Sequence, residues 1–192
     1  GVLRINGGKT RGCILYDYLD PAVINQDFTR KSFDTIILDG GVQVYDSGEL
    51  PVFAFRNYDV IDKITQSKTD VILRDVIYTR KSDANTNGGL ILNQGSLKQF
   101  GSLTIDNLTK KIDGVDTVAT KYPLLKNVRS NIVKVLSTEK FTFQDLFTDK
   151  LDVIGGSIGD EKLVFYNLSV TDHARFTSTT LNESMSQYSV LG

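Results

Sequence analysis

The stretch RINGGKTRG, from Arg4 to Gly12, invites a chemical reading because Gly8-Lys9-Thr10 is how a phosphate-binding loop ends. Such a loop needs a glycine five residues before its Gly-Lys pair, and Leu3 occupies that position. It also needs a helix directly afterwards, whereas Cys13 to Leu19 is an aromatic and aliphatic run typical of a strand. The sequence therefore predicts a hairpin turn at Asn6-Gly7-Gly8 and no bound nucleotide.

The segment DANTNGGLILNQ resembles a calcium loop in its spacing of oxygen-bearing side chains. Asp83, Asn85 and Asn87 supply oxygens at alternate positions, and Gly88 provides the sharp turn. The twelfth position is Gln94, which cannot offer the bidentate carboxylate that closes such a site. We therefore expect no calcium binding tighter than about millimolar, and a polar hairpin loop is the simpler interpretation.

Nucleophilic or acid–base catalysis would depend on His173, the single histidine, with the single cysteine, Cys13, or a serine as partner. Asp172 is adjacent in sequence and is not spaced to orient the imidazole ring, so a catalytic triad is the weaker interpretation. Carboxylates are scattered along the chain, and no spacing selects a pair among them. One cysteine excludes an intramolecular disulfide and a cysteine-based zinc site. The sequence predicts no catalytic residue and no cofactor.

The composition is that of an ordinary globular chain. The protein has 192 residues, of which 40% are hydrophobic and 23% charged, with a formal net charge of −1. This charge gives no general attraction to nucleic acid, and no apolar run is long enough to span a membrane. The basic stretch from Lys121 to Lys134 is better explained by a neighbouring acidic segment than by a polyanion.

Short β-branched and aromatic runs separated by glycine-containing turns fill the first part of the chain and predict an antiparallel meander. Helical spacing is limited in that part to residues 59–68, and the apolar content of residues 69–80 favours a strand. The expected strands cover residues 13–19, 33–38, 42–46, 50–55 and 69–80.

The second half predicts two amphipathic helices between residues 123 and 155. The first would begin at Pro123, and the second would end at Gly155-Gly156. Opposite charges on the two helices favour their packing together. The first helix carries its apolar stripe at Leu124, Leu125, Val128, Ile132, Val135 and Leu136, and the second at Phe143, Leu146, Phe147, Leu151 and Ile154.

These elements predict one α+β domain over residues 1–192. It would comprise a β-rich, antiparallel part (1–120), the helical pair (123–155), C-terminal strands (161–181) and an extended tail (182–192). GGVQVYDSGELPVFAF and GGSIGDEKLVFY look alike, but their spacings differ and do not establish a repeat.

The leading functional hypothesis is a non-enzymatic structural subunit, such as a virion, phage-tail or surface-assembly component, whose edge strands and ends pair with other protein subunits. Its predicted interaction residues are the apolar side chains of the tail, and its location would be a virion or extracellular rather than cytoplasmic. The first alternative is an extracellular ligand- or carbohydrate-binding module with a weak calcium loop. The second is a hydrolase using carboxylates or His173. The tail residues concerned are Met185, Tyr188, Val190 and Leu191.

Overall fold

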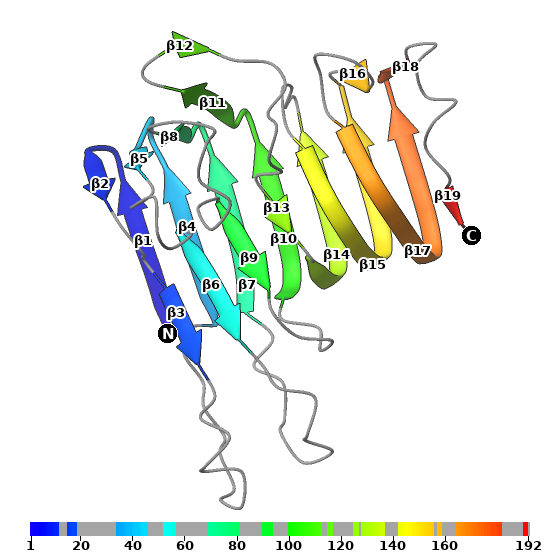
Figure 1. Cartoon of the computed structure of the whole chain (residues 1–192), viewed down its shortest axis with the longest axis horizontal. Helices are drawn as coiled ribbons and strands as arrows, with labels where there is room; N and C mark the ends of the chain where they lie inside the picture. Colours follow the sequence, from blue (N-terminus) through cyan, green and yellow to red (C-terminus); the bar gives the residue numbers. More distant parts are fainter. Residues whose placement is uncertain are drawn as a thin grey trace, which may run out of the picture.

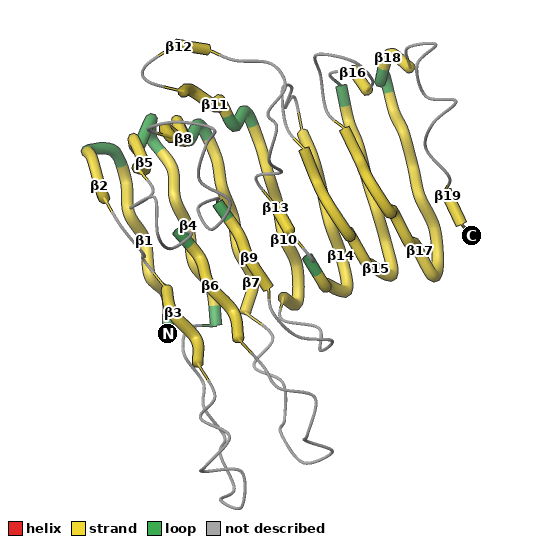
Figure 2. Tube along the Cα trace, in the orientation of Figure 1, coloured by secondary structure: helices red, strands yellow, loops and turns green. Residues whose placement is uncertain are grey.

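The computed structural model shows a chain built of strands (Figures 1 and 2). Its described part contains no helix and is 79% strand. The structure describes residues 1–11, 15–18, 34–45, 52–56, 69–80, 90–93, 100–112, 115–116, 125–126, 128–136, 142–155, 157–158, 164–181 and 190–191.

The strands form three faces, and in the first four turns the backbone visits each face in turn before it returns to the first (Figure 1). We call these faces A, B and C. Face A contains β1 (Val2–Asn6), β4 (Thr35–Asp39), β7 (Thr69–Arg74), β10 (Phe100–Asp106), β14 (Arg129–Leu136) and the later residues of β15 (Thr142–Ile154) and β17 (Val164–Thr177). Face B contains β2 (Lys9–Arg11), β5 (Gln43–Tyr45), β8 (Ile77–Arg80) and β11 (Thr109–Ile112). Face C contains β3 (Leu15–Tyr18), β6 (Phe53–Arg56), β9 (Ile91–Asn93), β13 (Leu125–Lys126) and the first residues of β15 and β17.

Four short strands complete the list. β12 (Val115–Asp116) pairs antiparallel with β11, β16 (Ser157–Ile158) pairs with β18 (Thr180–Leu181), and β19 (Val190–Leu191) pairs with β17. All the other described pairings are parallel, and each joins a strand to its equivalent in the next turn. The architecture is a parallel β-helix, a solenoid in which every turn contacts only its neighbours.

The turns differ in length along the solenoid. In face A, Leu3 pairs with Ile36, Ile36 with Val71, Val71 with Leu103, Leu103 with Val133, Val133 with Leu151, and Leu151 with Ala174. Successive turns are therefore separated by 33, 35, 32, 30, 18 and 23 residues. The solenoid has long turns at its start and short turns at its end.

A corner residue with a left-handed backbone follows the face A strand, leading to face B in the first four turns and to β16 and β18 after β15 and β17. Glycine adopts this conformation freely, and Asn and Asp tolerate it better than other residues. The N–H of the corner residue donates to the carbonyl of the next turn in several cases, as from Asn107 to Leu136 at 3.1 Å and from Gly155 to Thr177 at 2.8 Å. The described corner residues, all with positive φ, are Gly7, Gly40, Asp75, Asn107, Gly155 and Ser178.

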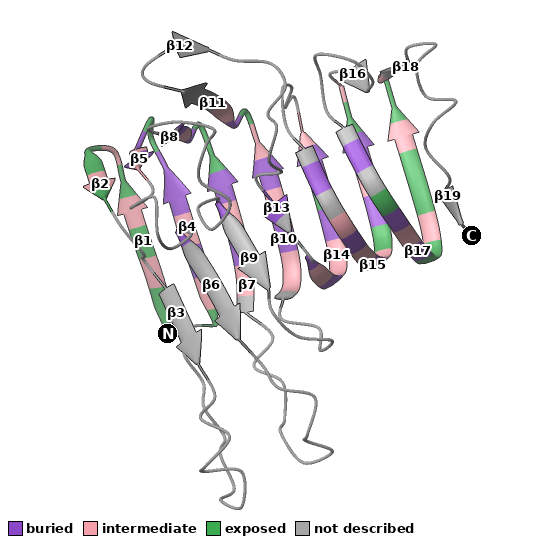
Figure 3. Cartoon of the chain, viewed as in Figure 1, coloured by how far each residue is buried: buried purple, intermediate pink, exposed green. Residues whose placement is uncertain are grey.

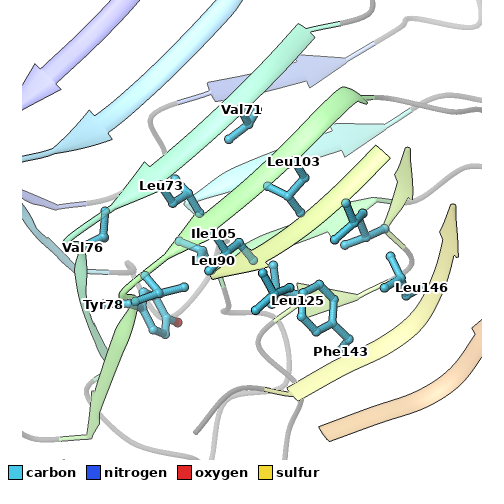
Figure 4. Close-up of a cluster of buried hydrophobic side chains, with 14 of the residues drawn as sticks. Val71, Leu73, Val76, Tyr78, Leu90, Leu103, Ile105, Leu125, Phe143 and Leu146 are labelled. Atoms are coloured by element: carbon cyan, nitrogen blue, oxygen red, sulfur yellow. The ribbon is translucent and has the colours of Figure 1, made fainter. Parts of the chain in front are cut away.

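The core is a set of aligned columns inside the solenoid (Figure 4). Parallel pairing places equivalent residues of successive turns one above another, so apolar residues stack on apolar residues. In face C, Phe143 and Phe165 are such a pair, with ring centroids 5.1 Å apart. The two columns of face A run through Leu3, Ile36, Val71, Leu103, Val133, Leu151 and Ala174, and through Ile5, Leu38, Leu73, Ile105, Val135, Val153 and Phe176.

The predicted helical pair at 123–155 is wrong. Phe143, Leu146, Thr148, Leu151 and Val153 are buried at alternating steps of three and two residues. The two-residue steps are strand alternation. The first three-residue step crosses Asp145, whose φ is 58°, and the second crosses Asp149, where the register with β17 shifts. The three-residue steps imitate helical periodicity.

The predicted antiparallel meander is also wrong, although several of its strands are confirmed. The runs at 33–38, 42–46 and 50–55 overlap β4, β5 and β6, and residues 69–80 contain β7 and β8. Asn6-Gly7-Gly8 is a turn, with φ of 69° at Gly7 and 79° at Gly8. It does not close a hairpin, because β1 pairs with β4 and β2 pairs with β5. The expected helix at 59–68 lies outside the described residues.

Candidate functional site

His173 lies on the outer side of face A, in β17. The sequence predicts a turn at Thr171-Asp172-His173, but β17 continues through these residues with a β-bulge. Lys150 of the neighbouring strand pairs with His173. Asp172 Oδ2 lies 3.5 Å from Lys150 Nζ and 3.6 Å from His173 Nδ1, and all three side chains are 40% or more exposed. The imidazole–carboxylate distance exceeds that of a hydrogen bond, so this cluster does not hold the ring in one orientation.

Two β-bulges lie at one level of face A, and each contains the same polar contact. Gly101 and Ser102 stand opposite Asp70, and Ser102 Oγ donates to Asp70 Oδ1 at 2.8 Å. In β17, Thr171 and Asp172 stand opposite Asp149, and Thr171 Oγ1 donates to Asp149 Oδ1 at 2.8 Å. Bulges re-aim side chains, and here they bring a hydroxyl onto the carboxylate of the preceding turn.

The corners carry a second set of contacts between turns. Asn107 Nδ2 donates to Asp75 Oδ1 at 2.6 Å, and Asn167 Nδ2 donates to Asp145 Oδ1 at 2.7 Å. All four residues have positive φ. The Asp75–Asn107 pair stands between faces A and B, and the Asp145–Asn167 pair stands between faces C and A.

Asp39 is the most buried carboxylate of the described residues, with 5% exposure. Arg4 Nη2 donates to its Oδ2 at 2.6 Å, and Asn6 Nδ2 donates to its Oδ1 at 2.9 Å. The hydrogen bond from Arg4 lowers the pKa of Asp39 against the opposing effect of desolvation, and the charge of Arg74 lowers it further. The same contact raises the pKa of Arg4. This pair joins the first two turns.

The end of face A formed by β17 leaves core-facing positions open to solvent (Figure 3). Ala174 and Phe176 pair with Leu151 and Val153, which are 0% and 2% exposed. Ala174 itself is exposed, and Phe176 is only partly buried against the core. Among the described residues, β19 pairs with β17 at Leu168 and Ser169 and no strand pairs with the remainder of that edge.

The structure describes only some of the other predicted site residues. Asp83, Asn85, Asn87, Met185, Tyr188 and Cys13 lie outside the described residues. Val190 and Leu191 form β19, which pairs with β17 of the same chain, and a role in binding other subunits stays a prediction. Over the described ranges, no group of three or more His, Cys, Asp and Glu side chains is placed to hold a metal ion. The same ranges contain no helix long and apolar enough to cross a membrane.

Sequence reasoning missed the exposed end of the core. RFT, from Arg175 to Thr177, has the alternation of any half-buried strand, and nothing in it identifies an edge. The corners had a weak signal, since an Asn or Asp precedes an aliphatic residue at Asp75-Val76, Asn107-Leu108, Asp145-Leu146 and Asn167-Leu168.

Comparison with protein-family models, curated proteins and solved structures finds no match to this chain.

Proposed function

We propose that this chain is a non-enzymatic structural subunit that works through protein–protein contacts made by its strand edges. The observation that carries the proposal is the open end of the core in β17, where Ala174 is exposed and Phe176 is partly buried. An edge strand presents unpaired N–H and C=O groups, and another strand adds readily to it. A strand added there would cover both side chains, as the next turn covers their equivalents elsewhere.

The polar side chains support the same proposal. The contacts of Asp39, Asp75, Asp145 and Asp149 all join neighbouring turns. These carboxylates accept hydrogen bonds that join one turn to the next, so they serve the cohesion of the solenoid. A virion, a phage tail and a surface assembly are settings that use such a subunit.

The test is the molecular mass in solution as a function of protein concentration, measured by sedimentation velocity. We expect the wild-type mass to rise with concentration and Ala174→Lys to abolish the rise, because a buried, unpaired ammonium opposes strand addition. Thr104→Lys is the matched control, since Thr104 lies in the central strand β10, half-buried and between core-facing neighbours. A wild-type protein that stays monomeric at every concentration contradicts the proposal.

A further inference from the structure

The strands of face B are rich in basic residues. β2, β5, β8 and β11 follow one another along the solenoid (Figure 1). They contain five basic residues and no acidic residue, although the whole chain has 22 basic and 23 acidic residues. Positive charge is therefore concentrated in the strands of one face of a nearly neutral chain. The basic residues are Lys9, Arg11, Arg80, Lys110 and Lys111.

The two basic side chains of β2 are exposed and have no carboxylate partner. Lys9 and Arg11 form no ion pair within the described part of the chain. On face A, by contrast, four basic side chains lie 2.6 to 3.9 Å from a carboxylate, and these are Arg4, Arg74, Lys150 and Arg175. The charges of face A are largely satisfied within the protein, whereas those of Lys9 and Arg11 are open to an anionic ligand.

Two polar side chains of β5 stand beside these cations. Lys9 pairs with Gln43 in the parallel register, and the next outward pair is Arg11 and Tyr45. Because Val44 is fully buried, its two neighbours on β5 occupy outward positions. The Tyr45 hydroxyl donates to Gln43 Oε1 at 3.1 Å, which holds the two side chains together. The Gln43 amide nitrogen has no acceptor among the described residues, so its two N–H groups can donate to a ligand.

We propose that the outer side of face B binds an acidic polysaccharide, a polymer that carries carboxylates among many hydroxyl groups. Lys9 and Arg11 pair with the carboxylates, and Gln43 donates to hydroxyl oxygens. The Tyr45 ring supplies an apolar surface for the C–H groups of a sugar. The proposal goes beyond the structural function proposed above. It concerns the outward side of the sheet, so it does not depend on which strand pairs with either edge.

Charge density favours a polysaccharide over a nucleic acid. Duplex DNA carries about one charge per 1.7 Å, and single strands are bound by a series of aromatic rings in a basic groove. The side chains described on face B include two exposed cations and one outward aromatic ring, Tyr45, since Tyr78 is fully buried. Asp75 is exposed at the neighbouring corner and repels closely spaced phosphates. A polymer with at most one carboxylate per sugar suits this surface better.

The test is the binding of sodium polygalacturonate, which has one carboxylate per sugar, to the full chain by isothermal titration calorimetry. We expect Lys9→Gln and Arg11→Gln together to lower the affinity about threefold to thirtyfold, because two exposed ion pairs are lost. Lys134→Gln and Lys150→Gln together are the matched control. They remove the same charge from exposed positions on face A and are expected to leave binding unchanged. Dextran, an uncharged polysaccharide, is expected to bind more weakly than polygalacturonate.

Tyr45 separates a built site from general charge attraction. Tyr45→Ala removes the ring without changing the charge, and we expect it to weaken polygalacturonate binding about twofold to tenfold. Tyr45→Phe keeps the ring and loses only the hydrogen bond to Gln43, so its effect should be smaller. Circular dichroism melts check that every variant keeps the wild-type strand signal. If the double face B variant unfolds, Lys9→Gln alone replaces it.

Three results would overturn the proposal. The first is a wild-type protein that does not bind polygalacturonate, and the second is an equal loss of affinity in the face A control. The third is tighter binding of single-stranded oligothymidylate that depends on the same face B residues, which would make the partner a nucleic acid. None of these results bears on the structural function, because sedimentation velocity without polysaccharide tests that function separately.

Discussion

The first four turns of the solenoid and its last turns build the same core from different lengths of chain. Early turns are separated by 30 to 35 residues and use short strands, such as the five-residue β1 and β4. The last turns are separated by 18 and 23 residues, and β15 and β17 run for 13 and 14 residues through two faces. One left-handed residue, Asp145 or Asn167, is enough to carry such a strand from face C into face A.

Turn length alone gives the late region little advantage in stability. Closing a turn of 18 rather than 33 residues saves roughly 0.5 kcal/mol of chain entropy, since the cost grows only with the logarithm of length. The larger difference is in strand pairing, because β15 pairs with β17 over almost its whole length while β1 pairs with β4 over five residues. In a solenoid, stability is close to a sum of contacts between neighbouring turns. We therefore expect the late turns to form the stable unit onto which the early turns fold.

The largest expected effect is the loss of unfolding free energy when a core side chain is truncated, and it should be larger in the late turns than in the first turn. Leu151→Ala removes a fully buried side chain from the late turns, and we expect it to lower the free energy of unfolding by about 2 to 5 kcal/mol. Leu3→Ala, in a partly buried position of the first turn, is expected to cost less than half as much. Chemical denaturation followed by circular dichroism measures both. Equal losses would show that the first turn contributes as much as the late turns.

Substitutions of corner residues are expected to lower the free energy of unfolding by an intermediate amount. Asn167→Ala loses the hydrogen bond to Asp145 and places a Cβ-bearing residue at a φ of 55°, so we expect a loss of about 1 to 3 kcal/mol. Asn167→Gly keeps the backbone conformation and loses only the side chain, so it should cost about 1 kcal/mol. The same two changes at Asn107, in the long turns, test whether the corners are equivalent. Thermal melts of the four variants decide between equal and unequal corners.

The smallest expected effect is a pH dependence confined to the early turns. Arg4 lowers the pKa of Asp39, so the stabilisation is present above the ordinary aspartate pKa of about 3.9 and is lost as pH falls through the lower folded-state value. We expect wild type and Asp39→Asn to differ in melting temperature at pH 7 and to converge toward pH 2. Asp152→Asn, in the late turns, serves as the comparison. A difference at Asp39 that persists unchanged to pH 2 would contradict the charge-pair explanation.

Individual strands were predictable from the sequence, but their partners were not. The apolar and β-branched runs of β4 and β7 indicate strands because alternation of burial depends on the single strand. Parallel and antiparallel neighbours require the same alternation, so the sequence does not distinguish a glycine turn such as Gly7-Gly8 from a hairpin. Buried positions in β14 and β15 are separated by three residues at intervals, as between Ser130 and Val133 and across the left-handed Asp145, and this spacing imitates a helical pattern in strands.

The candidate site was less predictable than the fold. Ala174 and Phe176 face the core like their equivalents in earlier turns, and their exposure results from the position of β17 at the end of the strand order. That position depends on pairing across the whole chain and has no local signature. The corner residues do have one, an Asn or Asp before an aliphatic residue, which becomes informative once several corners are aligned.

The first corner, at Asn6-Gly7, also bears on asparagine deamidation. In an Asn-Gly sequence, the glycine amide nitrogen can attack the asparagine side-chain carbonyl, expel ammonia and leave a succinimide that hydrolyses to aspartate or isoaspartate. Here the Gly7 N–H is bound to the Asp39 carbonyl at 2.9 Å, and the departing Asn6 amide is bound to the Asp39 carboxylate at 2.9 Å. Both reacting groups are held by the next turn, so we expect deamidation of Asn6 to require the separation of β1 from β4.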